Sequence, residues 1–375
     1  MINTHFNARA NTLNSVKIGI CGLGTVGSGT VKVLSRNTKE INARAGCQII
    51  ISQVGARRDN PDCDLGDVSV SRDIFAVAEN PDIDILVELI GGTTVAKELI
   101  LKAIANGKHV VTANKALIAE FGNEIFAAAK EKGVTVAFEA AVAGGIPIIK
   151  AIREGLSANR IEWLAGIING TGNFILTEMR DKGRDFADVL KEAQALGYAE
   201  ADPTFDVEGI DAAHKLVILA SLAFGIPLQF DKVFTEGISK IEPQDVTYAQ
   251  QLGYRIKHLG IARRNTDDGV MNAILVKGDA VGPTLYYGPG AGAEPTASSV
   301  IADIVDLART LSADPEHRVP HMGFQLDQLK DIAVLPIGEV ETAYYLRINA
   351  LDVPGVLAKI TQVLSDANIS VEAVI

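Results

Sequence analysis

The stretch from Leu196 to Ala223 concentrates groups that could do chemistry. Within it, Asp211 and Lys215 stand four residues apart, which places them on one face of a helix. Carboxylates can bind an ammonium group and a lysine can transfer a proton, so the stretch is a candidate active site for an amino-acid substrate. The alternative is a surface ion pair after a solvated loop. The carboxylates in or next to the stretch are Glu192, Glu200, Asp202, Asp206, Glu208 and Asp211.

A glycine-rich loop near the start of the chain is a second candidate site. The apolar run 16–21 leads into a G-x-G-x-x-G motif and then into a helical pattern, which is the context typical of dinucleotide binding. A pyrophosphate would rest on the N-terminus of that helix, and a glycine-rich turn without a ligand is the alternative. The loop consists of Gly22, Leu23, Gly24, Thr25, Val26 and Gly27.

The end of the next apolar run, 48–54, bears on the choice of cofactor. An NAD site usually has an acidic residue there, which binds the ribose hydroxyl groups. Here Arg57 and Arg58 stand at that position, although Asp59 follows closely. Paired arginines suit a 2′-phosphate, so we expect NADP or NAD, with a slight preference for NADP.

Alternating strand and helix patterns must position these groups. Strands are expected at 83–90, 109–112 and 134–138, and helices at 95–106 and 122–132. This alternation predicts a doubly wound parallel sheet that binds its ligands at the carboxyl ends of the strands. The residues expected at such ends are Gly91, Thr93, Lys115 and Glu139.

The second half of the chain mixes turns with further strands and helices. The turn from Asn169 through Thr171 to Asn173 offers backbone N–H donors at a helix start, which could bind a substrate carboxylate. The loop 139–147 exposes carbonyl oxygens and one carboxylate, which suit a hard monovalent cation. Strands are expected at 161–168, 254–262 and 271–281. A glycine-rich turn is expected at 286–292, followed by a helix that starts at 295–299. In the tail we expect a strand at 343–352, a helix from 354 and a second strand at 369–375.

The overall composition excludes several classes of partner. The chain has 375 residues and a formal net charge of −11, so neither nucleic acid nor an anionic membrane surface is an expected partner. The three cysteines show no metal-like spacing and indicate a reducing compartment. The polar start of the chain lacks the apolar core of a signal peptide, so we expect a cytoplasmic protein.

Several of these runs resemble those of bacterial homoserine dehydrogenase. They are G-L-G-T-V-G at 22–27, V-E-L-I-G-G at 87–92, H-V-V-T-A-N-K-A-L at 109–117, F-E-A-A-V-A-G-G-I-P at 138–147, N-G-T-G-N-F at 169–174, the long run 196–219 and G-A-G-x-x-P-T-A-S-S-V at 290–300. The resemblance covers about residues 16–309. The tail is similar to the start of an ACT domain, a small amino-acid-binding regulatory module, through L-R-I-N-A-L-D-V-P-G-V-L at 346–357.

The resemblance implies a reaction and roles for individual residues. The reaction is the NAD(P)-dependent interconversion of L-homoserine and L-aspartate 4-semialdehyde in threonine, methionine and isoleucine biosynthesis. Lys215 would be the general acid–base, with a pKa that burial should lower, and Asp211 and Glu200 would hold the substrate. Lys115 would orient substrate and cofactor, and Gly197 and Gly292 would contact the cofactor. The implied sodium site consists of Glu139, Val142, Gly144 and Ile146, the last three through backbone oxygens.

The resemblance also implies a domain order. We expect an N-terminal extension at 1–15, a Rossmann-type domain at 16–139, an α+β catalytic and dimerisation domain at 140–312 whose last helix could return to the Rossmann domain, a linker at 313–341 and a partial ACT-like βαβ tail at 342–375. A homodimer or homotetramer is expected, with threonine as a candidate effector. Two departures, the short connection at 263–269 and the half-length tail, leave dimerisation through the substrate-domain sheet and feedback by an amino acid in doubt.

Three alternatives compete with this prediction. The first is a non-catalytic nucleotide-binding redox sensor on the same fold, which an intact Asp211–Lys215 pair argues against. The second is an aldehyde dehydrogenase that works through a cysteine thioester, but all three cysteines precede residue 64. The third makes the tail an amino-acid-sensing interaction module, which its incompleteness disfavours.

Overall fold

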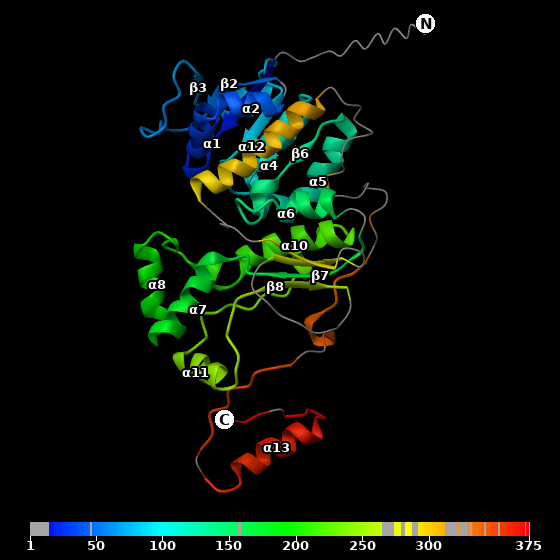
Figure 1. Cartoon of the computed structure of the whole chain (residues 1–375). Helices are drawn as coiled ribbons and strands as arrows, with labels where there is room; N and C mark the ends of the chain where they lie inside the picture. The colour runs from blue at the N-terminus through cyan, green and yellow to red at the C-terminus, as the bar shows by residue number, and fades with distance from the viewer. Residues whose placement is uncertain are drawn as a thin grey trace, which may run out of the picture. The chain divides into compact units, whose positions relative to one another are not determined.

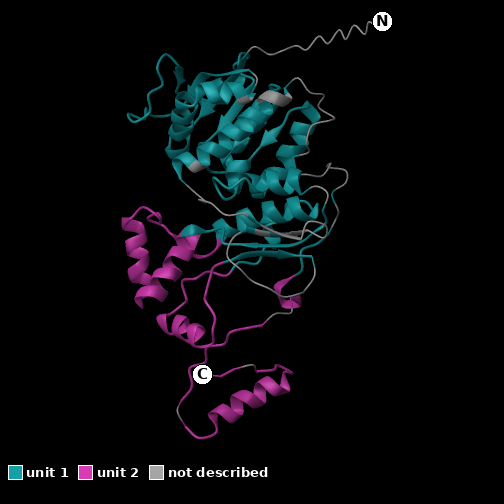
Figure 2. Ribbon diagram, viewed as in Figure 1, with its two compact units in different colours: residues 1–170, 210–235, 259–335 teal, residues 171–209, 236–258, 336–375 magenta. Residues whose placement is uncertain are grey.

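The computed structural model describes residues 15–45, 47–156, 159–264, 274–278, 282–286, 292–311, 321–322, 329, 332–340, 343–351, 353–371 and 373–374. Figure 1 shows its helices and strands, and Figure 2 colours its two compact units. Unit 1 comprises residues 1–170, 210–235 and 259–335, and unit 2 comprises residues 171–209, 236–258 and 336–375.

Unit 1 contains a parallel six-stranded sheet in the order β3-β2-β1-β4-β5-β6. The strands β4 and β5 are buried along their whole length, as expected of a parallel sheet with helices on both faces. The strand order reverses between β1 and β4, which is where sheets of this type bind ligands. The predicted doubly wound sheet is therefore confirmed. Its strands are β1 (Ser15–Cys21), β2 (Gln48–Gly55), β3 (Ser69–Ser71), β4 (Ile85–Glu88), β5 (His109–Thr112) and β6 (Val136–Ala137).

Helices pack on both faces of this sheet. Alternate strand residues point to opposite faces, so Leu86 and Val110 join one core cluster, whereas Val87 and Val111 join the other. The first cluster includes α3 (Ile74–Glu79), α4 (Thr94–Ala105) and α5 (Lys115–Lys132). The second includes α1 (Thr25–Arg36), α2 (Thr38–Ala45) and α12 (Ala293–Thr310).

Helix α12 reaches this core from a distant part of the sequence. It packs against α1 at Gly29, where an added Cβ would stand 2.9 Å from the Ala293 carbonyl oxygen. Arg36 and Glu294 extend the contact with a two-pronged ion pair at 3.0 and 3.1 Å. The core of the parallel sheet is thus completed by a helix that follows all four strands of the second sheet in the chain.

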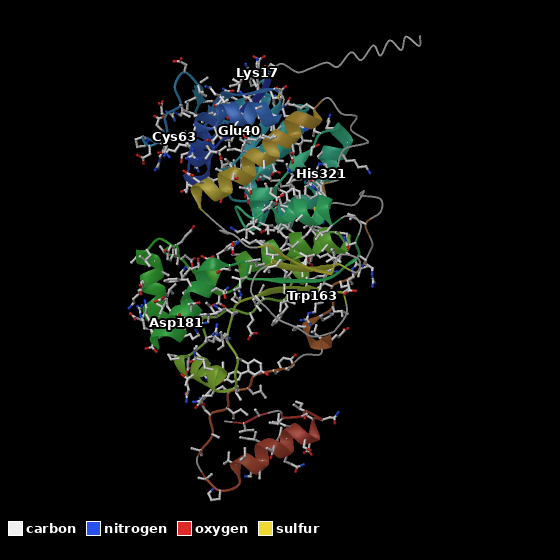
Figure 3. The ribbon with its side chains drawn as sticks, in the orientation of Figure 1. Lys17, Glu40, Cys63, Trp163, Asp181 and His321 are labelled. Carbon is white, nitrogen blue, oxygen red and sulfur yellow. The ribbon has the colours of Figure 1, made fainter. Side chains whose placement is uncertain are left out.

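A second, antiparallel sheet in unit 1 has the order β10-β9-β7-β8. Its strands are β7 (Ile161–Gly166), β8 (Gly260–Arg263), β9 (Ile274–Gly278) and β10 (Gly282–Tyr286). Trp163 of β7, labelled in Figure 3, belongs to this sheet. The helix α10 (Ile210–Phe224) packs against β7, β8 and α5. Shorter turns are η1 (Glu139–Ala141), α6 (Ile148–Lys150), η2 (Ala151–Gly155) and η3 (Phe230–Lys232).

Unit 2 is mainly helical. A small core that includes Ile175, Met179, Val189 and Val246 holds its helices together, apart from the helix at 356–366, in which no residue is buried. They are α7 (Gly170–Lys182, entering from unit 1), α8 (Phe186–Ala195), α9 (Thr204–Val207), α11 (Pro243–Gln251) and α13 (Val356–Asp366), with the short turn η6 (Ile337–Glu339).

Several element boundaries differ from the expectation. Helix α5 begins at Lys115, not at 122, because the Asn114 side chain accepts a hydrogen bond from the Leu117 N–H and caps the helix. The strand expected at 254–262 is confined to β8, which extends one residue further, and the described part of the strand expected at 271–281 is β9. The elements α2, β3, α3 and β10 were not predicted. The expected connection at 263–269 lies, apart from Arg263 and Arg264, outside the described residues.

The strands predicted in the tail are wrong for the part of the tail that the structure describes. Residues 343–351, 353–371 and 373–374 contain α13 but no strand. A strand needs a paired neighbour, and the described residues of the tail provide none. Leu346 and Leu351 are accordingly 59% and 80% exposed. Of the expected linker, His321 and Met322 are packed rather than solvated: the His321 ring stacks on Phe126 of α5 at 5.2 Å.

Candidate active site

The glycine-rich loop has the geometry of a dinucleotide cradle. Gly22 adopts φ +105°, and a Cβ there would stand 2.5 Å from the Leu89 carbonyl oxygen. A Cβ on Gly27 would stand 2.0 Å from the Gly22 carbonyl oxygen, so only glycine fits. Gly24, by contrast, faces open space at the start of α1, whose first turn carries no acidic residue. An anionic pyrophosphate fits this position. Leu23, Thr25 and Val26 complete the loop.

The other expected cofactor contacts are distributed over both units. Gly91, with φ +73°, and Thr93 follow β4 and lead into α4. Gly292 is the N-cap residue of α12, next to the contact of Ala293 with α1. Gly197, with φ +75°, lies after α8 in unit 2.

A buried carboxylate that the sequence reasoning missed connects two strand ends. Glu88, fully buried at the end of β4, accepts hydrogen bonds from the N–H groups of Ile90 and Gly91 at 2.9 and 3.0 Å and from the Thr112 hydroxyl at 2.6 Å. Burial raises the pKa of the Glu88 carboxyl, against the effect of these bonds. The feature of the sequence that could have identified Glu88 is a glutamate within an otherwise apolar strand.

This network continues to the start of α5. The Asn114 N–H donates to the Thr112 hydroxyl oxygen at 3.0 Å, and the Asn114 side-chain amide donates to the Gly92 carbonyl at 2.6 Å. Asn114 also caps α5, whose first residue is Lys115. The position of Lys115 is therefore tied to the loop after β4, where the cofactor contacts are expected.

The basic loop after β2 presents its arginines to solvent. Arg57 and Arg58 are exposed, whereas the carboxylate of Asp59 is held by Arg72 at 2.7 and 2.9 Å. Arg72 also donates to the Ala56 carbonyl at 3.0 Å, and Asn60 donates to the Leu23 carbonyl at 2.8 Å. The charge of Asp59 is thus paired with that of Arg72, and hydrogen bonds join the loop to the glycine-rich motif.

The structure brings together Lys115, Asn169, Asp211 and Lys215. The Lys215 Nζ lies 2.8 Å from the Asp211 Oδ2 and 2.7 Å from the Ile168 carbonyl oxygen. The Lys115 Nζ lies 3.1 Å from the Asp211 Oδ1. The Asn169 side-chain amide donates to the Asp211 Oδ2 at 2.8 Å. Two lysines from different helices therefore share one carboxylate.

The environment of Asp211 rules out a surface ion pair. The side chains of Asp211 and Lys215 are only 6% and 15% exposed. Burial by itself would raise the pKa of Asp211, but the charges of Lys215 and Lys115 and the hydrogen bonds lower it below its ordinary value. The carboxylate is therefore ionised and holds the amine of Lys215 in place near the start of α10.

The remaining expected substrate residues belong to unit 2. The Thr171 hydroxyl donates to the Tyr198 carbonyl at 2.7 Å, next to Gly197. Glu200 is exposed in the loop before α9, and Gln194 donates to its carbonyl at 3.0 Å. Thr171 therefore fastens the segment that carries Gly197 and Glu200.

The loop from Glu139 to Ile146 is tightly buried. The Glu139 carboxylate accepts the N–H groups of Ile149 and Lys150 at 2.9 Å each, and the Ser299 hydroxyl donates to the Gly144 carbonyl at 2.6 Å. Ala143 and Gly144 both have positive φ, so the backbone of the loop turns sharply directly after Val142. Burial, with a contribution from Asp303, raises the pKa of Glu139 to about 7.

The three cysteines do not have the properties of a nucleophile. Burial raises the pKa of the Cys21 thiol to about 12, and it also raises those of Cys47 and Cys63. A thioester mechanism needs a cysteine with a lowered pKa, so the cysteine-dependent alternative is disfavoured.

Among the helices of the described residues, none combines the length and apolarity that crossing a bilayer requires.

Family models match three segments of the chain. The homoserine dehydrogenase NAD-binding domain matches residues 22–139, homoserine dehydrogenase matches residues 147–305, and the ACT domain matches residues 344–375. A homoserine dehydrogenase from Pseudomonas aeruginosa is 66% identical over 382 aligned residues, which cover 96% of this chain and 88% of that protein. One from Neisseria gonorrhoeae is 53% identical and covers 97% and 88%, respectively.

Solved structures agree with these relatives. A homoserine dehydrogenase from Thiobacillus denitrificans is 60% identical, with a TM-score of 0.90 over 96% of this chain and 88% of that one. A hyperthermophilic archaeal homoserine dehydrogenase in complex with NADPH is 27% identical, with a TM-score of 0.62 over 78% and 97%. The redox-sensor alternative finds no support among these proteins. The chain therefore belongs to the homoserine dehydrogenase family, the NAD(P)-dependent oxidoreductases that interconvert L-homoserine and L-aspartate 4-semialdehyde.

Proposed function

We propose that Lys215 is the general acid–base of this dehydrogenase and that Asp211 holds it in place. The observation that carries the proposal is the shared carboxylate: Asp211 accepts from Lys215, Lys115 and Asn169. A carboxylate with this many donors is better suited to holding the lysines than to binding the substrate ammonium. Binding of that ammonium is accordingly assigned to Glu200, and binding of the substrate carboxylate to the turn with Asn169 and Thr171.

The chain's own groups can carry the proton through the reaction. The bound nicotinamide supplies or accepts the hydride. Lys215 gives its proton to the substrate oxygen during reduction and takes it back during oxidation, while Asp211 keeps the amine at a fixed place. Lys115 orients the substrate and the cofactor from the start of α5.

Steady-state kinetics of Lys215→Ala test the proposal. We expect kcat for homoserine oxidation to fall by about 10²–10⁴-fold, whereas the dissociation constant for NADPH should stay within about twofold. Lys102→Ala is the matched control, because Lys102 of α4 forms an exposed ion pair with Glu79 of α3. Equal losses of turnover and of cofactor affinity would assign Lys215 to the fold instead.

For the cofactor, the finer proposal is a preference for NADP over NAD. The exposed side chains of Arg57 and Arg58 support it, because the nearby Asp59 is already paired with Arg72. The archaeal relative bound to NADPH also supports it. Arg57→Ala combined with Arg58→Ala should weaken NADPH binding and leave NADH binding unchanged. If both cofactors weaken equally, the arginines do not read the 2′-phosphate.

Sodium binding at the loop 139–146 is also a proposal. The carboxylate of Glu139 already accepts two backbone N–H groups, so its main-chain oxygen and those of Val142, Gly144 and Ile146 are the candidate ligands. Saturable stabilisation by NaCl, compared with choline chloride at equal ionic strength, would support the site. Ser299→Ala should change this stabilisation, because Ser299 bonds the Gly144 carbonyl.

The ACT-domain match at 344–375 supports a proposal on regulation and assembly. We propose an amino-acid effector, with threonine as the candidate, and a homodimer or homotetramer in a reducing, cytoplasmic setting. Kinetics with and without threonine test the effector, and light scattering measures the oligomer.

A further inference from the structure

The proposed active site depends on how two helices face each other. Lys115 belongs to α5, whereas Asp211 and Lys215 belong to α10, and both helices lie in unit 1 (Figure 2). Each Asp211 oxygen contacts a different lysine, at 3.1 and 2.8 Å. A small slide of α10 along α5 would therefore break one of these contacts.

A second polar contact connects the same two helices. The His214 Nε2 lies 3.2 Å from the Glu120 Oε1. Glu120 follows Lys115 on α5, and His214 stands between Asp211 and Lys215 on α10. The His214 side chain is 2% exposed, whereas that of Glu120 is 33% exposed. The protein thus encloses the His214 side chain, whereas that of Glu120 reaches solvent.

The surroundings of His214 favour a neutral ring in a fixed orientation. The ring stacks on Phe230 of η3 at 4.2 Å and 22°. Burial lowers the pKa of His214, and the charge of Lys115 lowers it further, while Glu120 on α5 and Asp211 on its own helix act in the opposite direction. A neutral ring donates its Nε2–H to Glu120.

We propose that Glu120 and His214 form a positioning pair that sets the register of α10 on α5 at which Asp211 contacts both lysines. This inference rests on the proposed role of Lys215. Neither residue touches the reacting atoms. Their effect passes through Asp211, since a displacement of about 1 Å at a catalytic group can cost about 10²-fold in rate.

Kinetics of Glu120→Ala and His214→Leu test the positioning pair. We expect kcat for homoserine oxidation to fall about tenfold or more in each variant, because small misplacements of catalytic groups slow the chemical step. NADPH affinity, measured by fluorescence titration, should stay within about twofold. Glu120→Gln and His214→Gln retain a hydrogen-bonding amide and should restore most of kcat. Glu124→Ala is the matched control, because Glu124 on the same helix pairs with Lys97 at 2.7 Å, away from α10.

A double-mutant cycle separates positioning from simple stabilisation. Lys115→Ala should cost less in a Glu120→Ala background than in the unmodified chain, because the Lys115–Asp211 contact is already impaired. Because Glu120 is partly exposed, its truncation should leave a folded protein, which the fluorescence of Trp163 can verify.

The proposal is overturned if Glu120→Ala and His214→Leu keep kcat and only lower the melting temperature, or if the Lys115 and Glu120 effects simply multiply. Failure of the proposed function would look different. In that case Lys215→Ala itself would retain turnover, whatever the Glu120 variants do.

Discussion

At the scale of single residues, glycines and one carboxylate decide what the two candidate sites can hold. Gly27 has no room for a Cβ, whereas Gly24 has open space in front of it. The two positions therefore do different things, although both belong to one motif. Gly27 is needed for the packing of β1 on α1, and Gly24 leaves space for the ligand. The same holds for Asp211: the neighbouring lysines and hydrogen bonds keep this buried carboxylate ionised.

This contrast leads to a prediction for two alanine variants. Gly24→Ala should keep the melting temperature of the unmodified protein but weaken NADPH binding by at least about tenfold, because the methyl group occupies ligand space. Gly27→Ala should destabilise the protein, since its Cβ would stand 2.0 Å from a backbone oxygen. Thermal melts and NADPH titrations distinguish the two. Gly155→Ala, also in open space, is the control, and a loss of stability in Gly24→Ala would contradict the prediction.

At the scale of elements, polar networks fix where helices begin. Glu88 and Thr112 join the ends of β4 and β5, and through Asn114 they fix the start of α5. Glu120 and His214 join α5 to α10 further along. The first network thus lies next to Lys115 at the start of α5, and the second joins the two helices that carry Lys115 and Asp211.

The first network can be tested at Thr112. Thr112→Val removes the hydroxyl that donates to the fully buried Glu88, which should cost about 1–3 kcal/mol of unfolding free energy. The same variant should lower kcat/KM, because the start of α5 is no longer fixed. Thr112→Ser keeps the hydroxyl and is the matched control. Urea unfolding followed by the single tryptophan, Trp163, gives the stability, and equal stability of the two variants would argue against the network.

At the scale of the whole molecule, buried titratable groups determine how stability depends on pH. Burial lowers the pKa of His321 to about 4, aided by the charges of Arg153 and His109. Burial raises the pKa of Asp303 to about 6 and that of Glu139 to about 7. His321 is protonated more easily in the unfolded chain, so its contribution is lost as pH falls through about 6.5 toward 4. The carboxyls are protonated more easily in the folded chain, so their contribution is lost as pH rises from about 4 to 7.

His321→Phe should therefore change the pH profile of stability. Relative to the unmodified chain, its unfolding free energy should rise by about 2 kcal/mol between about pH 7 and pH 5, because the penalty for keeping the ring neutral is gone. Asp303→Asn should show the opposite trend. Urea unfolding at several pH values measures both, and parallel profiles for all three proteins would contradict this assignment.

The sequence by itself determined the local features. The run from β1 through Gly27 into α1 and the four-residue spacing of Asp211 and Lys215 are encoded in neighbouring residues, where backbone geometry and helical periodicity suffice. The parallel sheet followed from alternating patterns. The start of α5 could also have been predicted, because Asn114 is a good N-cap residue. The lack of strands in the described residues of the tail could not have been predicted, because a strand forms only where a partner strand pairs with it.

Only the tertiary structure decided which distant residues meet. Glu88 binds Thr112 because β4 and β5 are neighbours in the sheet, whereas Lys115 meets Asp211 because α10 packs on α5. Likewise, α12 meets α1 through tertiary packing. Contacts across long stretches of chain leave no periodic signal, since each partner sits in an ordinary local pattern. Burial acts in the same way: the four-residue spacing of Asp211 and Lys215 is common in surface ion pairs, and only the packing around the two side chains makes this pair a buried one.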